Sequence, residues 1–160
     1  MFSQISNLAT KFRAHWKNYV GQSIFATLIF SAILIALNVQ IRPIITASVG
    51  ATAFIVFAIP SDVTANTKNI IGGHIIGILA GTFSAWLASE SSAFLFYSLA
   101  VGLSIFLMVI TDCEHPPASG TALGLSVSGA SLDVILTLII CVVILAVVHW
   151  VFRGYLRDLR

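Results

Sequence analysis

The chain has 160 residues, of which 58% are hydrophobic and only 9% are charged. A soluble globular domain carries roughly 25% charged residues, so this composition excludes a soluble enzyme and indicates an all-α integral membrane protein embedded in the lipid bilayer. The net charge of +2 does not indicate a nucleic-acid partner, because the basic residues are concentrated near the two ends of the chain.

The first 18 residues combine apolar side chains at intervals of three and four with basic residues between them. The apolar positions are Phe2, Ile5, Leu8, Phe12 and Trp16, and the basic ones are Lys11, Arg13 and Lys17. This period predicts an amphipathic helix over 1–18 that lies on the cytoplasmic leaflet. The alternative is a disordered tail.

Six apolar segments follow, and we expect them to form a single transmembrane domain over 19–155 with a cytoplasmic tail at 156–160. The segments cover 20–38, 44–59, 70–88, 94–110, 117–130 and 132–152. The second and fifth are short and begin at Pro43 and at Pro116-Pro117. Proline is favoured at the first position of a helix, because no partner exists there for the missing N–H. These two segments either cross the membrane or re-enter it.

Charge favours a topology in which both termini are cytoplasmic. With six crossings, the inner side holds nearly all basic residues, and Arg42 alone lies outside, beside Glu90 and Asp133. Two re-entrant segments would leave four crossings and keep both termini inside. Charge alone separates these two topologies poorly.

The two halves of the chain show a short internal similarity. Residues 42–48 and 115–121 each contain a basic residue or histidine, a proline, and hydroxyls three and five positions after that proline. This pattern predicts a 3+3 inverted repeat, in which two short helices direct their N-termini at an anion near the middle of the membrane. Chance, or shared helix-start chemistry, is the alternative explanation.

The residues 111–121 (TDCEHPPASGT) place acids, a histidine and hydroxyls between long apolar runs. Ionisable groups at membrane depth are costly and usually line a pathway. A helix N-terminus also attracts anions. We therefore expect an anion-binding site formed by His115, Pro116, Pro117, Ser119 and Thr121, together with His74, Asn69, Thr46 and Ser48. Each histidine could instead serve a structural hydrogen bond, and each hydroxyl could bond its own helix backbone.

Four charged residues are candidates for the mouths of the pathway or for gating: Asp112, Glu114, Lys68 and Arg42. The two acids would repel an anion at the site itself, so we expect them to face water, to pair with Lys68, or to orient His115. The spacing of acids, Cys113 and His115 does not fit a metal site, and we predict neither a metal nor a cofactor. No catalytic motif is found.

Gly73, Gly77 and Gly81 recur every four residues on the third apolar segment. This spacing leaves one helix face bare, so that another helix backbone can approach closely. We interpret these glycines as helix-packing residues. The bare face also predicts association of copies of the chain into a homo-oligomer.

Several ordered motifs resemble the HPP family of integral membrane proteins. They are His115-Pro116-Pro117-Ala118 with 121–123 (TAL), 48–53 (SVGATA), Pro60-Ser61 and 69–74 (NIIGGH), and the resemblance covers about 40–130. The family occurs in bacteria and in plant chloroplasts, and its members in photosynthetic organisms are associated with nitrite transport. The resemblance implies an inner-membrane protein of a bacterium with nitrite, or a similar small monovalent anion, as its substrate.

The leading functional hypothesis is therefore a transporter or channel for a small inorganic anion. One alternative is a proton- or cation-coupled carrier that uses Asp112, Glu114, His115 and His74 as a relay. The other is a non-transporting membrane scaffold or sensor subunit with structural histidines. The acids that precede His115 are the feature that favours the carrier hypothesis.

Overall fold

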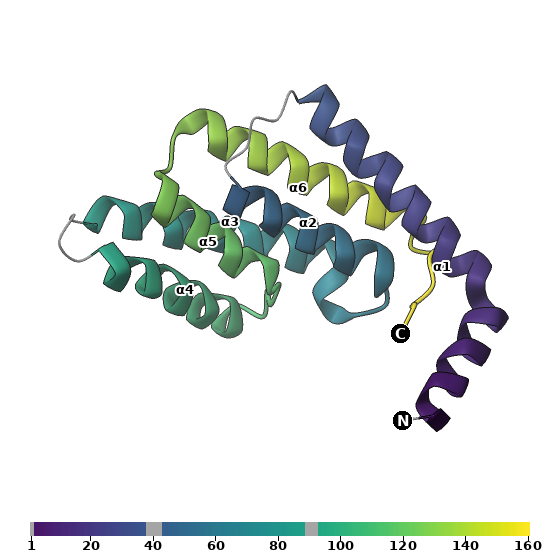
Figure 1. The fold of residues 1–160 in the computed structure, drawn as a ribbon. Helices are drawn as coiled ribbons and strands as arrows, with labels where there is room; N and C mark the ends of the chain where they lie inside the picture. Colours follow the sequence, from purple (N-terminus) through teal and green to yellow (C-terminus); the bar gives the residue numbers. More distant parts are fainter. Residues whose placement is uncertain (1, 38–42, 89–92) are drawn as a thin grey trace.

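The computed structural model describes residues 2–37, 43–88 and 93–160, and within the first helix it describes the side chains of residue 10 and of residue 12 onward. The described residues form six α-helices and one 3-10 helix, without any strand, which confirms the all-α prediction (Figure 1). The elements are α1 (Phe2–Ala36), α2 (Pro43–Ala58), η1 (Val63–Ala65), α3 (Thr67–Leu87), α4 (Ala93–Ile110), α5 (Pro117–Ser128) and α6 (Leu132–Phe152).

Four helices are long and apolar enough to cross a membrane: α3, α4, α6 and the part Phe12–Ala36 of α1. The other two are shorter, as predicted. The 16 residues of α2 and the 12 of α5 correspond to about 24 and 18 Å of helix, against the ~30 Å of a bilayer core. Both begin at the predicted prolines.

Consecutive helices run in opposite directions. On α2, Ile45 approaches Gly124 near the end of α5, whereas Thr52 contacts His115 just before α5 starts, so the two proline-initiated helices are antiparallel. A re-entrant segment would return the chain to the end of the bundle where it entered. Instead α5 carries the chain to the end where α6 begins, and α6 returns. The helices follow the six-segment alternation, and the antiparallel α2 and α5 fit an inverted arrangement.

Small residues let α3 and α5 pack closely as a parallel pair. A Cβ at Gly73 would lie 2.7 Å from the His115 Cβ, one at Gly77 would meet the Ala118 carbonyl oxygen, and one at Gly81 would lie 2.5 Å from that of Ala122. We call this contact the glycine seam. A larger apolar core lies beside it, where α2 and α6 bury Ile45, Val56, Leu138 and Leu145.

The basic residues with described side chains lie toward one end of the bundle, which we call the basic end: Arg13, Lys17, Lys68, Arg153, Arg157 and Arg160. Here α2 ends, α3 and α5 begin, and both termini are found (Figure 1). Arg42, predicted for the opposite mouth, lies outside the described residues.

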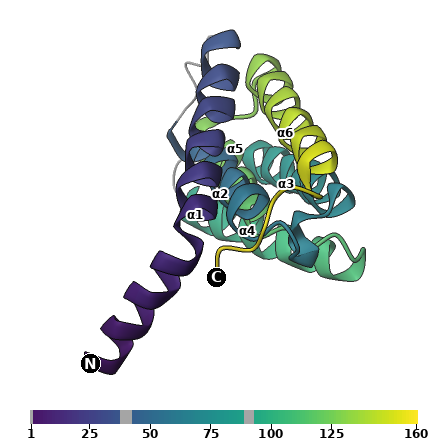
Figure 2. The ribbon, with the colours of Figure 1, turned by 90° about the vertical axis from the view of Figure 1, so that its right-hand side faces the viewer.

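Helix α1 is continuous from Phe2 to Ala36, across the boundary predicted at residue 18. No proline interrupts it, and its first part extends beyond the bundle (Figure 2). The C-terminal tail folds back onto the basic end. Gln22 of α1 donates from Nε2 to the carbonyls of Phe57 (2.6 Å) and Arg157 (2.9 Å), and its Oε1 accepts from the Arg157 amide (2.8 Å).

Candidate functional site

His115 occupies the position immediately before the two prolines that start α5. Its side chain is completely buried. Its Nδ1 lies 2.8 Å from the Thr64 carbonyl oxygen in η1, and its Nε2 lies 3.0 Å from the Thr52 hydroxyl of α2. A carbonyl can only accept, so Nδ1 carries a hydrogen and donates to Thr64. The ring is therefore held between two segments that are distant in sequence.

The Thr52 hydroxyl also contacts the second buried histidine, His74 of α3. The distance from Thr52 Oγ1 to His74 Nε2 is 2.9 Å, and the two imidazole ring centres are 5.1 Å apart. On its other side, His74 Nδ1 lies 2.8 Å from the Thr121 hydroxyl of α5. One threonine thus links the two histidines directly.

The contacts continue from Thr121 to Ser48 of α2. Their hydroxyl oxygens are 2.7 Å apart, and Ser48 donates to the Pro117 carbonyl at 2.6 Å. Five side chains from α2, α3, α5 and the residue before α5 therefore form one continuous set, which we call the histidine–hydroxyl chain: Ser48, Thr52, His74, His115 and Thr121. None of them is more than 4% exposed. Burying so many polar groups is tolerated only because they satisfy one another.

The start of α5 offers few free backbone donors, contrary to what its position suggests. The two prolines have no N–H, and the next two amides, of Ala118 and Ser119, donate to the carbonyls of His115 (2.9 Å) and Pro116 (3.1 Å). The donors available at this point are thus side-chain hydroxyls and imidazoles. Any contribution of the backbone is limited to the helix dipole.

Five predicted site residues are not members of the histidine–hydroxyl chain, and one of them, Pro117, contacts the chain only through its carbonyl, which accepts from Ser48. Thr46 lies on the first turn of α2, at the opposite end from His115, because α2 and α5 are antiparallel. Ser119 instead accepts a hydrogen bond from Ser104 of α4 at 3.2 Å. Asn69 donates to the Glu114 carbonyl at 3.1 Å, which fixes the turn before His115. Pro116 is exposed.

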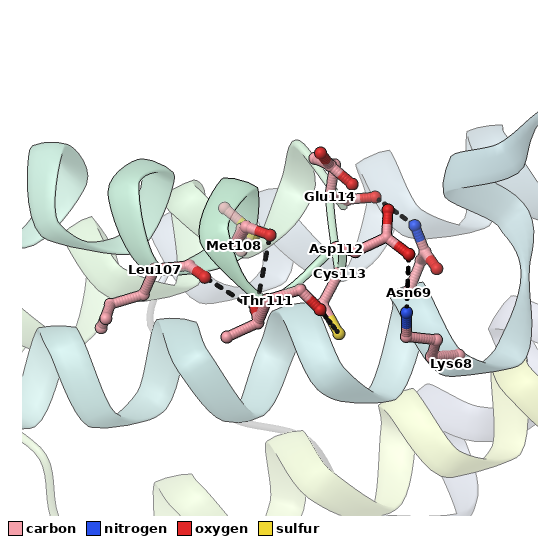
Figure 3. A network of polar contacts seen from close by, with 8 residues as sticks. All are labelled: Lys68, Asn69, Leu107, Met108, Thr111, Asp112, Cys113 and Glu114. Atoms are coloured by element: carbon pink, nitrogen blue, oxygen red, sulfur yellow. Dashed lines mark hydrogen bonds and ion pairs between the residues drawn. The ribbon is translucent and has the colours of Figure 1, made fainter.

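The turn 111–116 lies beside the start of α3 at the basic end (Figure 3). Lys68 and Asp112 form an ion pair at 2.9 Å, and both side chains are largely exposed. This is one of the roles predicted for the acids. Orientation of His115, another predicted role, is provided by the Thr64 carbonyl. Asp112 adopts a positive φ of 54°, a conformation that aspartate tolerates better than most residues.

Two members of the site were missed. Thr52 stands between alanines and reads as a packing residue, although it follows Ser48 by one helical turn and so shares its face. The Thr64 carbonyl is a backbone group, for which a sequence carries no signal. Asp62 holds this segment by accepting from the Thr64 amide (3.1 Å) and hydroxyl (2.8 Å), and these bonds lower the pKa of Asp62.

Two further buried hydroxyls lie along the glycine seam toward the opposite end. Ser84 continues the α3 face that carries Gly77 and Gly81, and Ser126 is one turn beyond Ala122 on α5. Neither hydroxyl has a hydrogen-bond partner within the described parts of the chain. Those parts also contain no group of three His, Cys, Asp or Glu side chains placed to hold a metal ion.

The face that carries Gly73, Gly77 and Gly81 is covered by α5 of the same chain. Close backbone approach is the property that the spacing predicts, and it is used within the molecule. The glycines therefore give no support to association between copies, which would need another face.

Comparisons with known proteins identify the family of the chain. A transmembrane protein of Dictyostelium discoideum is 36% identical over 90 residues, a match that covers 55% of this chain and 31% of that protein. The chain therefore corresponds to less than a third of this relative's length. No solved structure shows a significant match. The model of the HPP transmembrane region matches residues 11–158, nearly the entire chain. The chain belongs to the HPP family of membrane proteins.

Proposed function

We propose that this protein is not an enzyme but a transporter or channel that moves a small inorganic anion, nitrite in the first place, across the membrane along the histidine–hydroxyl chain. The observation that supports it best is the burial of five hydroxyl and imidazole groups where α2, α3 and α5 meet. Ionisable groups at such depth mark substrate pathways in membrane proteins. In the part of the chain that the structure describes, no carboxylate is hydrogen-bonded to this set.

Nitrite suits these donors because it is small, carries one negative charge and can only accept hydrogen bonds. Hydroxyls rotate freely enough to turn their hydrogens from one another toward a bound anion. The unpartnered hydroxyls of Ser84 and Ser126 supply further donors along the glycine seam. A buried hydroxyl without a partner costs about 1–3 kcal/mol of folding free energy. Binding of the transported anion would explain why two such hydroxyls are present.

The basic end supplies the electrostatic attraction. Its arginines and lysines raise the local concentration of anions, and the pairing of Asp112 with Lys68 reduces the repulsion that a free carboxylate would cause. The positive-inside rule assigns this end, with both termini, to the cytoplasm. We retain a bacterial inner membrane and a homo-oligomer as parts of the proposal.

The test is anion uptake into liposomes that contain the purified protein, with nitrite, nitrate, formate and chloride compared. We expect saturable uptake that favours nitrite. Replacing His115 with alanine should remove most of the uptake, since the ring joins Thr52 to Thr64. His15→Ala on the exposed side of α1 is the matched control.

His115→Asn provides a second variant, because its amide can still donate to the Thr64 carbonyl and support the fold. Both His115 variants should be inserted and monodisperse but slow. Wild-type uptake by either would remove His115 from the pathway. The absence of uptake for every anion by correctly inserted wild-type protein would refute the proposed function.

A further inference from the structure

The histidine–hydroxyl chain ends at both sides on a group that can only accept. At one end Ser48 contacts the Pro117 carbonyl, and at the other end His115 contacts the Thr64 carbonyl. Between these carbonyls the five side chains make six consecutive contacts, all between 2.6 and 3.0 Å. Each contact needs one hydrogen between its two heavy atoms.

Neutral side chains cannot supply all of these hydrogens. Each of the three hydroxyls has one, and each neutral imidazole has one, so the set holds one hydrogen fewer than the number of its contacts. One contact would then join two acceptors at hydrogen-bond distance. A single additional proton, which converts either imidazole to imidazolium, completes the set.

The additional proton can reside on either ring with each of these six contacts satisfied. The Thr52 hydroxyl also lies 3.2 Å from the Ser48 carbonyl, and it gives up this longer contact when its hydrogen is directed at a histidine. With His74 cationic, its Nε2–H donates to Thr52, whose own hydroxyl donates to His115 Nε2. To move the charge, the Nε2–H bond of His74 breaks and an O–H bond forms on Thr52. The original Thr52 proton forms an N–H bond on His115. The hydroxyl is regenerated and reoriented, and no other atom changes its bonds.

The charged and titratable groups around this set do not neutralise such a proton. From α3, Lys68 is paired with Asp112 of the 111–116 turn, and from the η1 segment Asp62 is paired with Arg160. Glu114 and Cys113 are only half-buried, and neither side chain is hydrogen-bonded to the set. The described parts of α2, α4 and α5 contain no acidic or basic side chain. On α6, the buried His149 contacts the Pro60 carbonyl rather than this set, and Asp133 is exposed. A buried imidazolium without an anionic partner is costly.

We propose that the missing partner is the transported anion, and that one proton, relayed between His74 and His115 by the Thr52 hydroxyl, crosses with each anion. This inference rests on the proposed function. Because the pair carries no net charge, transport is electroneutral and is driven by a pH gradient rather than by the membrane potential. In this relay, Thr52 takes the role that the sequence alternative gave to Asp112 and Glu114.

The experiment follows nitrite and proton uptake together in liposomes that contain the full-length protein and a trapped pH-sensitive dye. Potassium and valinomycin set the membrane potential independently of the pH gradient. Uptake by protein-free liposomes is subtracted, because nitrous acid crosses lipid unaided. We expect one proton per nitrite, acceleration by an acidic exterior, and no response to the potential.

Thr52→Val removes the relay while keeping the shape of the side chain, and Thr52→Ser restores a hydroxyl. We expect the valine variant to lose coupled uptake by about 100-fold, the scale on which a positioned proton-transfer group acts, and the serine variant to recover most of it. Thr137→Val is the matched control, since this hydroxyl bonds the backbone of its own helix at the exposed Asp133. Nitrogen NMR of labelled histidines, with nitrite bound, should show one imidazolium averaged over His74 and His115 in the wild type.

Each result decides between distinct conclusions. Nitrite uptake that follows the membrane potential and carries no proton would overturn the coupling and leave the proposed function standing. Two neutral imidazoles in the nitrite complex, or wild-type coupling by an intact Thr52→Val protein, would also overturn it. No uptake of any anion would instead refute the proposed function, and the coupling with it.

Discussion

Helices α2 and α5 both begin at a proline, yet they reach the site with different parts of their length. α5 contributes its beginning, with His115 just before it and Thr121 one turn inside. α2 contributes its middle, with Ser48 and Thr52. The cause is their packing: the two helices overlap side by side and antiparallel, so only one N-terminus can be near the site. Paired short helices can thus build a shared polar centre without directing both ends at it.

The two helices also differ in how tightly they are held. At the glycine seam, the backbone carbonyls of α5 lie directly against the glycines of α3. In contrast, α2 meets α5 through side chains, such as Ile45 against Gly124. Backbone cannot move aside for an added atom, but the end of an isoleucine can. The consequences of substitution should therefore differ strongly between the two contacts.

The largest effect is expected for Gly77→Val, which drives a side chain into the Ala118 carbonyl. Overpacking of this kind costs about 3 kcal/mol, so the yield of folded protein and its Tm in detergent should fall sharply. Gly102→Val on α4 is the control, because nothing lies within 4 Å of the added Cβ. Equal Tm values for the two variants would mean that α5 does not pack closely against Gly77 of α3.

The next effect concerns the part of α2 that serves the site. Ser48→Ala should slow nitrite uptake about tenfold, because it removes one donor from the site, together with its contacts to the Thr121 hydroxyl and the Pro117 carbonyl. Thr46→Ala, at the first turn of the same helix, should transport close to the wild-type rate. If Thr46→Ala slowed uptake more than Ser48→Ala, the N-terminus of α2 rather than its middle would contribute to the site.

A smaller effect is expected where α5 faces α2. In Gly120→Ala the new Cβ meets that of Ser48 at 3.4 Å, an ordinary contact. Alanine favours a helix over glycine by up to about 1 kcal/mol, so Tm should stay equal or rise slightly. A loss as large as that of Gly77→Val would show that both faces of α5 are packed with equal rigidity.

The smallest effect concerns η1, which positions His115 and has no counterpart at α2. Hydrogen bonds from Thr64 lower the pKa of Asp62 from its ordinary value of 3.8 in the folded protein. The carboxylate therefore stabilises the fold above pH 3.8, and this contribution is lost as the pH falls through the lower folded value. Compared with Asp62→Asn in thermal unfolding, the wild type should lose a small advantage in Tm only in that acidic range. An advantage that persists there would show that the bonds to Thr64 do not depend on the charge.

Local signals in the sequence were sufficient for the helices and for part of the site. Apolar length and the two prolines predict the starts of α2 and α5, and the segment predicted at 132–152 coincides with α6. The rarity of polar groups at membrane depth predicts His74, His115, Ser48 and Thr121 as site residues. The structure brings these four together.

The remainder depends on which helices become neighbours, and no local pattern reports this. The glycines predict a close contact but cannot say whether the partner is α5 or another copy of the chain. Thr52 gains its importance only from being placed between two rings from other segments. His149 of α6 is likewise buried, and its Nε2 lies 3.0 Å from the Pro60 carbonyl of the segment before η1, a contact between segments far apart in the sequence.

The hydrogen bonds of Gln22 with Phe57 and Arg157 constrain the order in which the protein assembles. Arg157 follows Gln22 by 135 residues, so during translation α1 is inserted long before these hydrogen bonds can form. Until Arg157 has left the ribosome, α1 lacks these contacts. A bulky domain fused directly after residue 160 should therefore weaken the packing of α1 on the bundle. Purification tags are better placed before residue 1.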